Sequence, residues 1–234
     1  MRLSNLTKLE WRLKQVAVLL LFGGQIGLGA AAEVLVEAEP RHHLVQDAGK
    51  YRIFDVEIPG GDTSLYHTHQ ADNFAIRVSA SQVINETPEG KRSEYATAPG
   101  SVSYGTASKA APYVHRVATV SGLFRAIMIE LPPSEGALPP VPTLPAPYVL
   151  EKATPRGAMY QLQLSPGAQI SLPHGGDALL VCLDEARLQA PDARHLVSEW
   201  SCRTGDYRLI QGMVPTRLVN PGSQNARLAV LVLP

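Results

Sequence analysis

The stretch GDTSLYHTHQADN, residues 61–73, decides how this chain is interpreted. Alternate side chains of a β-strand share a face, so His67 and His69 point the same way and Thr68 points away. His115 follows in a second segment rich in strand-forming residues. Two imidazoles on one strand face and a third from a distant strand predict a three-nitrogen metal site.

Length and composition favour a globular protein. The chain has 234 residues, of which 45% are hydrophobic and 18% charged, enough for one large or two small domains. The net charge is zero, so we expect no nucleic-acid partner. Nineteen glycines and nineteen prolines indicate many turns, as all-β folds need.

The segment 1–32 has the layout of a secretory signal peptide. Four basic residues open it, an apolar run covers residues 16–22, and Ala30-Ala31-Ala32 offers an A-x-A cleavage site. The alternative is an uncleaved membrane anchor, but the apolar run is short for a spanning helix of ~20 residues. We expect an exported protein, periplasmic or secreted, with no stable membrane anchor after cleavage.

Export changes the interpretation of the two cysteines. Cys182 and Cys202 are an even pair, and an oxidising compartment permits a disulfide between them. Both lie in sequence typical of strands. We expect the disulfide, and the alternative is a pair of buried free thiols.

A proline-rich segment divides the chain. Residues 131–147 contain seven prolines, a density that no helix or central strand tolerates. We expect a stiff linker over 132–147 between a first domain at 33–131 and a second at 148–234.

The two halves resemble each other, which indicates an internal duplication. Pro59-Gly60 in the first half matches Pro166-Gly167 in the second. The segments 54–58 and 159–164 alternate apolar and polar residues with period two, as half-buried strands do. Short strands between Gly/Pro turns favour a sandwich or jelly roll.

These motifs resemble those of the cupin superfamily. Its first motif has a glycine, five residues and then His-x-His, with an acidic residue four or five positions later; here Gly61 precedes His67 and His69. Its second motif has a Pro-Gly turn and a third histidine; here Pro99-Gly100 precedes His115. The resemblance covers both halves and implies an all-β bicupin with two tandem jelly-roll barrels.

The resemblance also implies a ligand set for a metal. Asn73 stands where the family usually has glutamate, and Asp72 lies one residue earlier. Asp72 is the better anion, although a shift of one residue can turn a side chain to the opposite face. The expected metal ligands are His67, His69, His115 and Asp72. Such a set suits Fe, Mn, Zn, Cu or Ni.

Several polar residues near the motifs are candidates for a substrate pocket. Tyr66, Tyr104 and Tyr113 flank motif positions, where a phenol can hydrogen-bond a substrate, or they simply pack on the barrel rim. Asn73 is the fourth pocket candidate.

Two further histidines and two arginines lie close to the motifs or to the expected mature N-terminus. We expect His42 and His43 to be solvated, because they lie in a polar stretch near the expected mature N-terminus. Arg77 and Arg116 could bind an anionic substrate. Strand alternation after His115 places Arg116 on the outer face.

The second half has lost the metal pattern. His174 matches His67, but Thr216 replaces His115. We expect this degenerate barrel to be structural or to form an interface. Cupin barrels often pack in pairs, within one chain or between chains, so a homo-oligomer is an expected possibility.

The resemblance implies several functions. The first is a metal-dependent enzyme acting on a small molecule, with dioxygenase chemistry the commonest in the family and isomerases and lyases also represented. No separate base is identifiable, so the catalytic residues stay unassigned. The alternatives are a non-catalytic bicupin that binds or senses a small ligand, and a structural exported protein.

Overall fold

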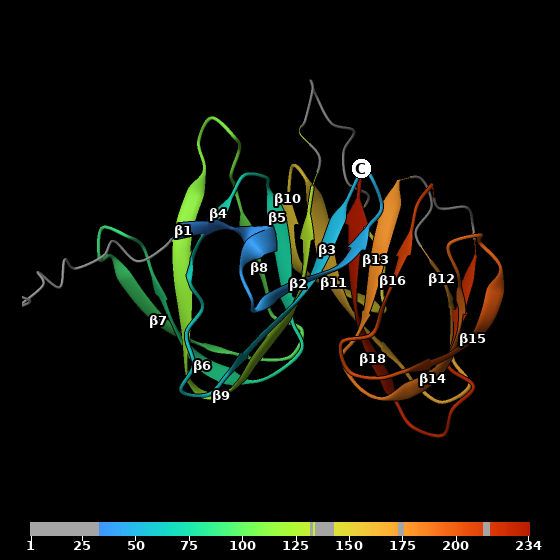
Figure 1. Ribbon diagram of the computed structural model, residues 1–234. Coiled ribbons are helices and arrows are strands. Elements are labelled where there is room, and N and C mark those ends of the chain that lie inside the picture. The colour runs from blue at the N-terminus through green and yellow to red at the C-terminus, as the bar shows by residue number, and fades with distance from the viewer. Residues whose placement is uncertain (1–32, 132, 134–142, 173–175, 213–215) are drawn as a thin grey trace, which may run out of the picture. The chain divides into compact units, whose positions relative to one another are not determined.

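The computed structural model describes residues 33–131, 133, 143–172, 176–212 and 216–234 (Figure 1). The expected signal peptide, most of the linker and His174 lie outside these residues. Within them, the regular structure is almost entirely strand, and the one helical element is a 3-10 turn at Val36–Ala38. No helix in these residues is long and apolar enough to cross a membrane.

The first nine strands form one sheet that curls into a barrel (Figure 1). They are β1 (Glu33–Leu35), β2 (His42–Asp47), β3 (Arg52–Pro59), β4 (Tyr66–His69), β5 (Asn73–Arg77), β6 (Ser81–Glu86), β7 (Arg92–Thr97), β8 (Val102–Gly105) and β9 (Tyr113–Glu130). The period-two segment 54–58 lies within β3, as predicted.

The remaining strands form a five-stranded and a four-stranded sheet. They are β10 (Tyr148–Thr154), β11 (Gly157–Leu164), β12 (Gln169–Ser171), β13 (Asp177–Cys182), β14 (Ala186–Pro191), β15 (Val197–Cys202), β16 (Tyr207–Ile210), β17 (Arg217–Val219) and β18 (Ala226–Leu233).

Strand order shows the duplication. The order β2-β3-β9-β5-β8 in the first half recurs as β10-β11-β18-β13-β16 in the second. Likewise β4-β9-β6-β7 recurs as β12-β17-β14-β15. In the first half, the long strand β9 pairs with β3 and β5 in one set and with β4 and β6 in the other. In the second half, β18 occupies its place in the first set and β17 in the second. The expected all-β fold of jelly-roll barrels is confirmed.

Three hydrophobic clusters hold the fold together. One lies inside the first barrel, around Phe54, Val56 and Phe124. A second fills the second barrel and includes Trp200. The third combines side chains of both halves, with Phe74 and its neighbours on the first-half sheet against residues of the second-half sheet. The five-stranded sheet of the second half and the matching strands of the first half (β2, β3, β9, β5 and β8) therefore pack on both faces, which explains their apolar sequence.

A polar contact accompanies this shared cluster. Asp177 at the start of β13 accepts hydrogen bonds from Lys50 Nζ at 2.8 Å and from the Tyr51 hydroxyl at 2.7 Å. Its other oxygen accepts the Gly212 amide at 2.6 Å. Burial raises the pKa of the Asp177 carboxyl, but the hydrogen bonds from Lys50, Gly212 and Tyr51 outweigh burial, so the pKa lies below its ordinary value.

The expected disulfide is present. Cys182 on β13 and Cys202 on β15 are bonded, with their Cα atoms 6.2 Å apart. These strands belong to different sheets of the second half, so the bond joins the two walls of that barrel. No free cysteine occurs in the described chain.

Asp177→Asn tests the polar contact between the halves. Asparagine has a single acceptor oxygen, so its NH2 group must face either the Gly212 amide or the Lys50 and Tyr51 donors. We therefore expect the free energy of unfolding at neutral pH to fall by about 2 kcal/mol. Because the folded-state pKa is lowered, this contribution is complete above the ordinary value of 3.8 and is lost as pH falls through the folded-state pKa. Denaturant unfolding at neutral and acidic pH measures both effects.

Glu199→Gln is the matched control, because Glu199 pairs with Arg187 on the exposed surface, where side chains are 76% and 73% exposed. Such a change is expected to alter the unfolding free energy by less than about 0.5 kcal/mol. Equal stability of Asp177→Asn and wild type at neutral pH would contradict the role assigned to Asp177.

Candidate metal site

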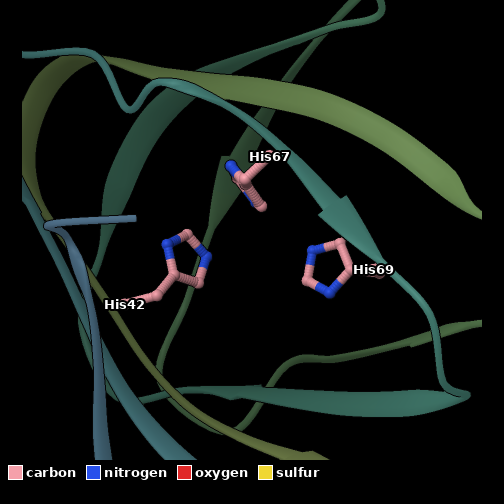
Figure 2. A group of neighbouring side chains, drawn as sticks. All are labelled: His42, His67 and His69. Atoms are coloured by element: carbon pink, nitrogen blue, oxygen red, sulfur yellow. The ribbon is translucent and has the colours of Figure 1, made fainter. Parts of the chain in front are cut away.

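Four histidines from three strands meet inside the first barrel. His67 and His69 lie on β4, and His115 on β9 stands directly opposite His67 in the strand register. His42 comes from the start of β2. Figure 2 shows the rings of His42, His67 and His69 turned toward one another across a common space.

The rings are close enough to share a metal ion. Ring centroids lie 4.2 Å apart for His42 and His67, 5.0 Å for His67 and His69, and 4.5 Å for His67 and His115. The Nε2 atoms of His69 and His115 are 3.0 Å apart. One nitrogen from each of His42, His67 and His69 lies within 4.8 Å of the other two.

Hydrogen bonds fix the orientation of three rings through their Nδ1 atoms. His67 Nδ1 is 2.9 Å from the Leu65 carbonyl oxygen, and His42 Nδ1 is 2.6 Å from Glu39 Oε2. His115 Nδ1 contacts Asn85 Oδ1. Since each partner is an acceptor, each Nδ1 carries the hydrogen and each Nε2 keeps a lone pair. This is how metal-binding histidines are held in proteins.

The fourth ring, that of His69, has no hydrogen bond at Nδ1. His69 Nδ1 faces Glu130 Oε1 at 3.9 Å, and both atoms are buried without a hydrogen bond. The other oxygen of Glu130 pairs with Arg52 at 2.5 Å. Glu130 Oε1 is therefore a buried, unpartnered carboxylate oxygen next to His69.

A second buried nitrogen of this site lacks a hydrogen-bond partner. His67 is fully buried, and its Nε2 has no hydrogen-bond partner. A buried nitrogen lone pair without a partner costs free energy. A cation bound by these nitrogens would remove that cost, so the donor set fits a divalent transition metal.

Electrostatics keep the rings of His42, His67 and His115 neutral. Burial, followed by the neighbouring His42 and His69, lowers the pKa of His67 to about 3. Burial also holds the pKa of His115 well below its ordinary value, and burial lowers the pKa of His42 although the Glu39 carboxylate partly opposes it. Neutral imidazole is the form that binds metals.

A cavity of about 630 Å³ adjoins the histidines. His42, His69 and His115 line it together with apolar side chains such as Phe124 and Met128. Its volume falls in the range of small-molecule sites, roughly 300–1,000 Å³. The second barrel's interior is instead packed with apolar residues.

Comparison with known proteins identifies the fold. No family model and no curated protein matches this sequence. Solved structures do match. AerE from Microcystis aeruginosa has a TM-score of 0.56 and 9% identity, over 79% of this chain and 88% of its own. The bacterial pirin YhhW from Escherichia coli, solved with nickel(II), has a TM-score of 0.55 and 12% identity, over 78% and 82%.

Oxalate decarboxylase from Lactobacillus farciminis has a TM-score of 0.53 and 12% identity, over 79% of this chain and 77% of its own. The chain has the cupin fold. At these identities the comparison establishes the fold alone.

The structure separates Asp72 from the histidine cluster. Asp72 Oδ2 accepts the Tyr104 hydroxyl at 2.9 Å, and Oδ1 accepts the Ala107 amide at 3.1 Å. Arg156 Nε lies 3.7 Å from Oδ2. Asp72 belongs to the bend before β5 and is not among the residues that line the cavity. Both oxygens of Asp72 are therefore engaged by groups outside the histidine cluster, and the assignment of Asp72 as a ligand stays a prediction.

Tyr66, which was expected to line the substrate pocket, lies outside the cavity. Its ring lies under the Arg116 guanidinium at 4.7 Å, and its hydroxyl donates to Glu86 at 3.1 Å. Neither Tyr66 nor Arg116 lines the cavity, so Arg116 is on the outer face as expected. Asn73, Tyr104 and Tyr113 do line it.

His42 and Glu130 are the residues that sequence reasoning missed. His42 was expected to be solvated but is only 6% exposed, while the adjacent His43 is exposed. His42 pairs with Val56 in the β2–β3 register, and this pairing turns it inward. No local motif marks either residue, because both reach the site through pairing with distant strands.

Asn85→Ala tests how His115 is held. Loss of the acceptor at His115 Nδ1 should weaken zinc binding about 10- to 100-fold, since removal of the group that orients a ligand typically costs this much. Competition with a chromophoric chelator measures the affinity.

Asn85→Asp is the matched control, because aspartate keeps an acceptor at the same position, and its zinc affinity should be at least that of wild type. Unchanged zinc affinity in Asn85→Ala would mean that His115 does not contribute to the site.

Proposed function

We propose that this protein is a metal-dependent cupin enzyme whose first barrel binds a divalent transition metal and acts on a small molecule. One observation carries the proposal: buried histidines converge, and His42, His67 and His115 hold their Nδ1 atoms against acceptors, which leaves Nε2 of each available. The metal, when bound, would supply Lewis-acid or redox chemistry. His69 and Glu130 complete the candidate ligand set.

The histidine ligands limit the candidate metal ions to those that bind imidazole well. Nitrogen-rich sites suit Zn, Cu, Ni, Fe and Mn, and affinity rises toward Cu along the series of divalent metals. The similarity to a pirin solved with nickel(II) supports a transition metal of this group. A hard cation such as Ca²⁺ would be expected to require more oxygen ligands than this cluster offers.

The cavity provides the place for a substrate beside the metal. Tyr104, Tyr113 and Asn73 supply polar groups on its wall, and apolar side chains such as Phe124 exclude water from the rest. Tyr104 donates its hydroxyl to Asp72, so its ring is fixed at the cavity wall. A fixed wall orients a bound molecule without further loss of side-chain entropy.

A second candidate is non-catalytic binding of a small ligand. No aspartate or glutamate is found among the described residues that line the cavity, and the histidines are committed to the cluster. A reaction that requires a separate carboxylate base would therefore find none in the wall. This observation favours either chemistry centred on the metal or capture without turnover.

Export is part of the proposal. The Cys182–Cys202 disulfide supports it, because disulfides persist in oxidising compartments and are rare in the cytosol. Fractionation of producing cells, followed by intact mass measurement, should recover a chain that starts near Glu33 outside the cytoplasm. Recovery of the uncleaved chain in the cytoplasm would contradict this part of the proposal.

Elemental analysis of the purified protein tests the metal site. We expect near-equimolar transition metal in wild type and its loss in His67→Ala/His69→Ala, which removes two of the converging ligands. His43→Ala is the control, because His43 is exposed and adjacent to the site, and it should keep the metal. Equal metal in wild type and the double variant would reject the site.

Turnover separates the two candidate functions. The metal-loaded protein is incubated with panels of small molecules while substrate loss and oxygen consumption are followed. Turnover that disappears in the double variant supports the enzyme. Saturable binding without turnover supports the ligand-binding alternative.

A further inference from the structure

A single arginine lies in the wall of the metal-site cavity. Asn73, Ala75 and Arg77 alternate along β5 and line the cavity, while Phe74 and Ile76 point to the cluster shared with the second half. Asn73 is at the histidine end of this strand, since its register partner Glu130 lies beside His69. Arg77 follows about 13 Å farther along the strand.

The Arg77 guanidinium is buried and lacks an opposite charge. Arg77 is 7% exposed, and its Nε has no hydrogen-bond partner. Nη1 donates to the Ala75 carbonyl at 2.7 Å, and the other interacting side chain is the phenol of Tyr95. Within the part of the chain that the structure describes, no carboxylate pairs with it. Buried charges in proteins are normally paired, because isolated ones are costly.

The surrounding wall favours an anion as the missing partner. None of the described lining residues is acidic, and Arg77 is the one lysine or arginine among them. Much of the remaining wall is apolar. The cavity therefore combines one fixed positive charge with a largely apolar interior.

We propose that the cavity binds a small organic monocarboxylate, with its carboxylate on Arg77 and its apolar body directed toward the histidine cluster. The inference rests on the proposal that this cavity is the ligand site, but it does not require the metal. Arg77 is then a specificity-determining residue, since it selects charged molecules over neutral ones of the same shape.

Charge and shape favour a carboxylate over a phosphate. A guanidinium matches the planar carboxylate fork, and one positive charge balances one negative charge. A phosphate monoester carries a charge of about −1.5 to −2 at neutral pH and would leave part of it uncompensated in this wall. Arg77 lines the cavity, and its Nε still lacks the acceptor that a carboxylate would provide.

Calorimetric titration of the full chain with benzoate, acetate, benzamide and phenyl phosphate tests the proposal. We expect benzoate to bind in the millimolar range or tighter, and benzamide at least about 10-fold more weakly. Arg77→Met should weaken benzoate binding about 10- to 100-fold, because it removes a charge-assisted hydrogen bond, and leave benzamide unaffected. Methionine approximates the arginine stem in volume, so the fold should persist.

Thermal unfolding provides a second readout. Benzoate should raise the melting temperature of wild type but not that of Arg77→Met, because a ligand stabilises the folded state that binds it. Arg116→Met is the matched control: Arg116 lies outside the cavity beside Tyr66, and its loss should leave benzoate binding unchanged.

Several outcomes would overturn the inference. One is that neither benzoate nor acetate binds in the millimolar range. Another is that phenyl phosphate binds more tightly than benzoate. A third is that wild type and Arg77→Met bind benzoate with equal affinity. Titrations with metal-free and zinc-loaded protein separate this inference from the proposed function. Benzoate binding that survives Arg77→Met but disappears in His67→Ala/His69→Ala would place the carboxylate on the metal and reject the role of Arg77.

Discussion

Strand β9 (Tyr113–Glu130) is the element on which the first barrel depends. It hydrogen-bonds to β3, β4, β5 and β6, and so connects the strands that face the second half with those that carry the histidines (Figure 1). Its start places His115 opposite His67, and its end places Glu130 opposite Asn73. Residues at both ends of this strand therefore lie beside the histidine cluster.

The two halves share a topology but differ in what fills them. The second barrel is packed with apolar side chains, whereas the first keeps a cavity of about 630 Å³. The nine-stranded sheet of the first half and the five-stranded sheet of the second bury side chains against each other in the shared cluster. A packed second barrel is therefore a rigid support for a first barrel whose interior is open to ligands, because close-packed interiors resist deformation.

Unpartnered buried polar atoms concentrate in the first barrel. Among the described residues they include His67 Nε2, His69 Nδ1, Glu130 Oε1 and Arg77 Nε. Native proteins leave few such atoms, and each costs free energy unless a ligand or water satisfies it. Nitrogen lone pairs near one end of β5 favour a cation, and a guanidinium at the other end favours an anion. The two ends of this cavity thus have opposite preferences.

The sequence by itself determined the strands of period two, the Gly/Pro turns, the repeat of the halves and the shared face of His67 and His69, because these are local properties of the chain. Only the tertiary structure decided that His42 and Glu130 enter the site and that Asp72 is engaged by Tyr104. Strand register between distant segments decides which side chains meet, and a shift of one residue reverses every side chain's face.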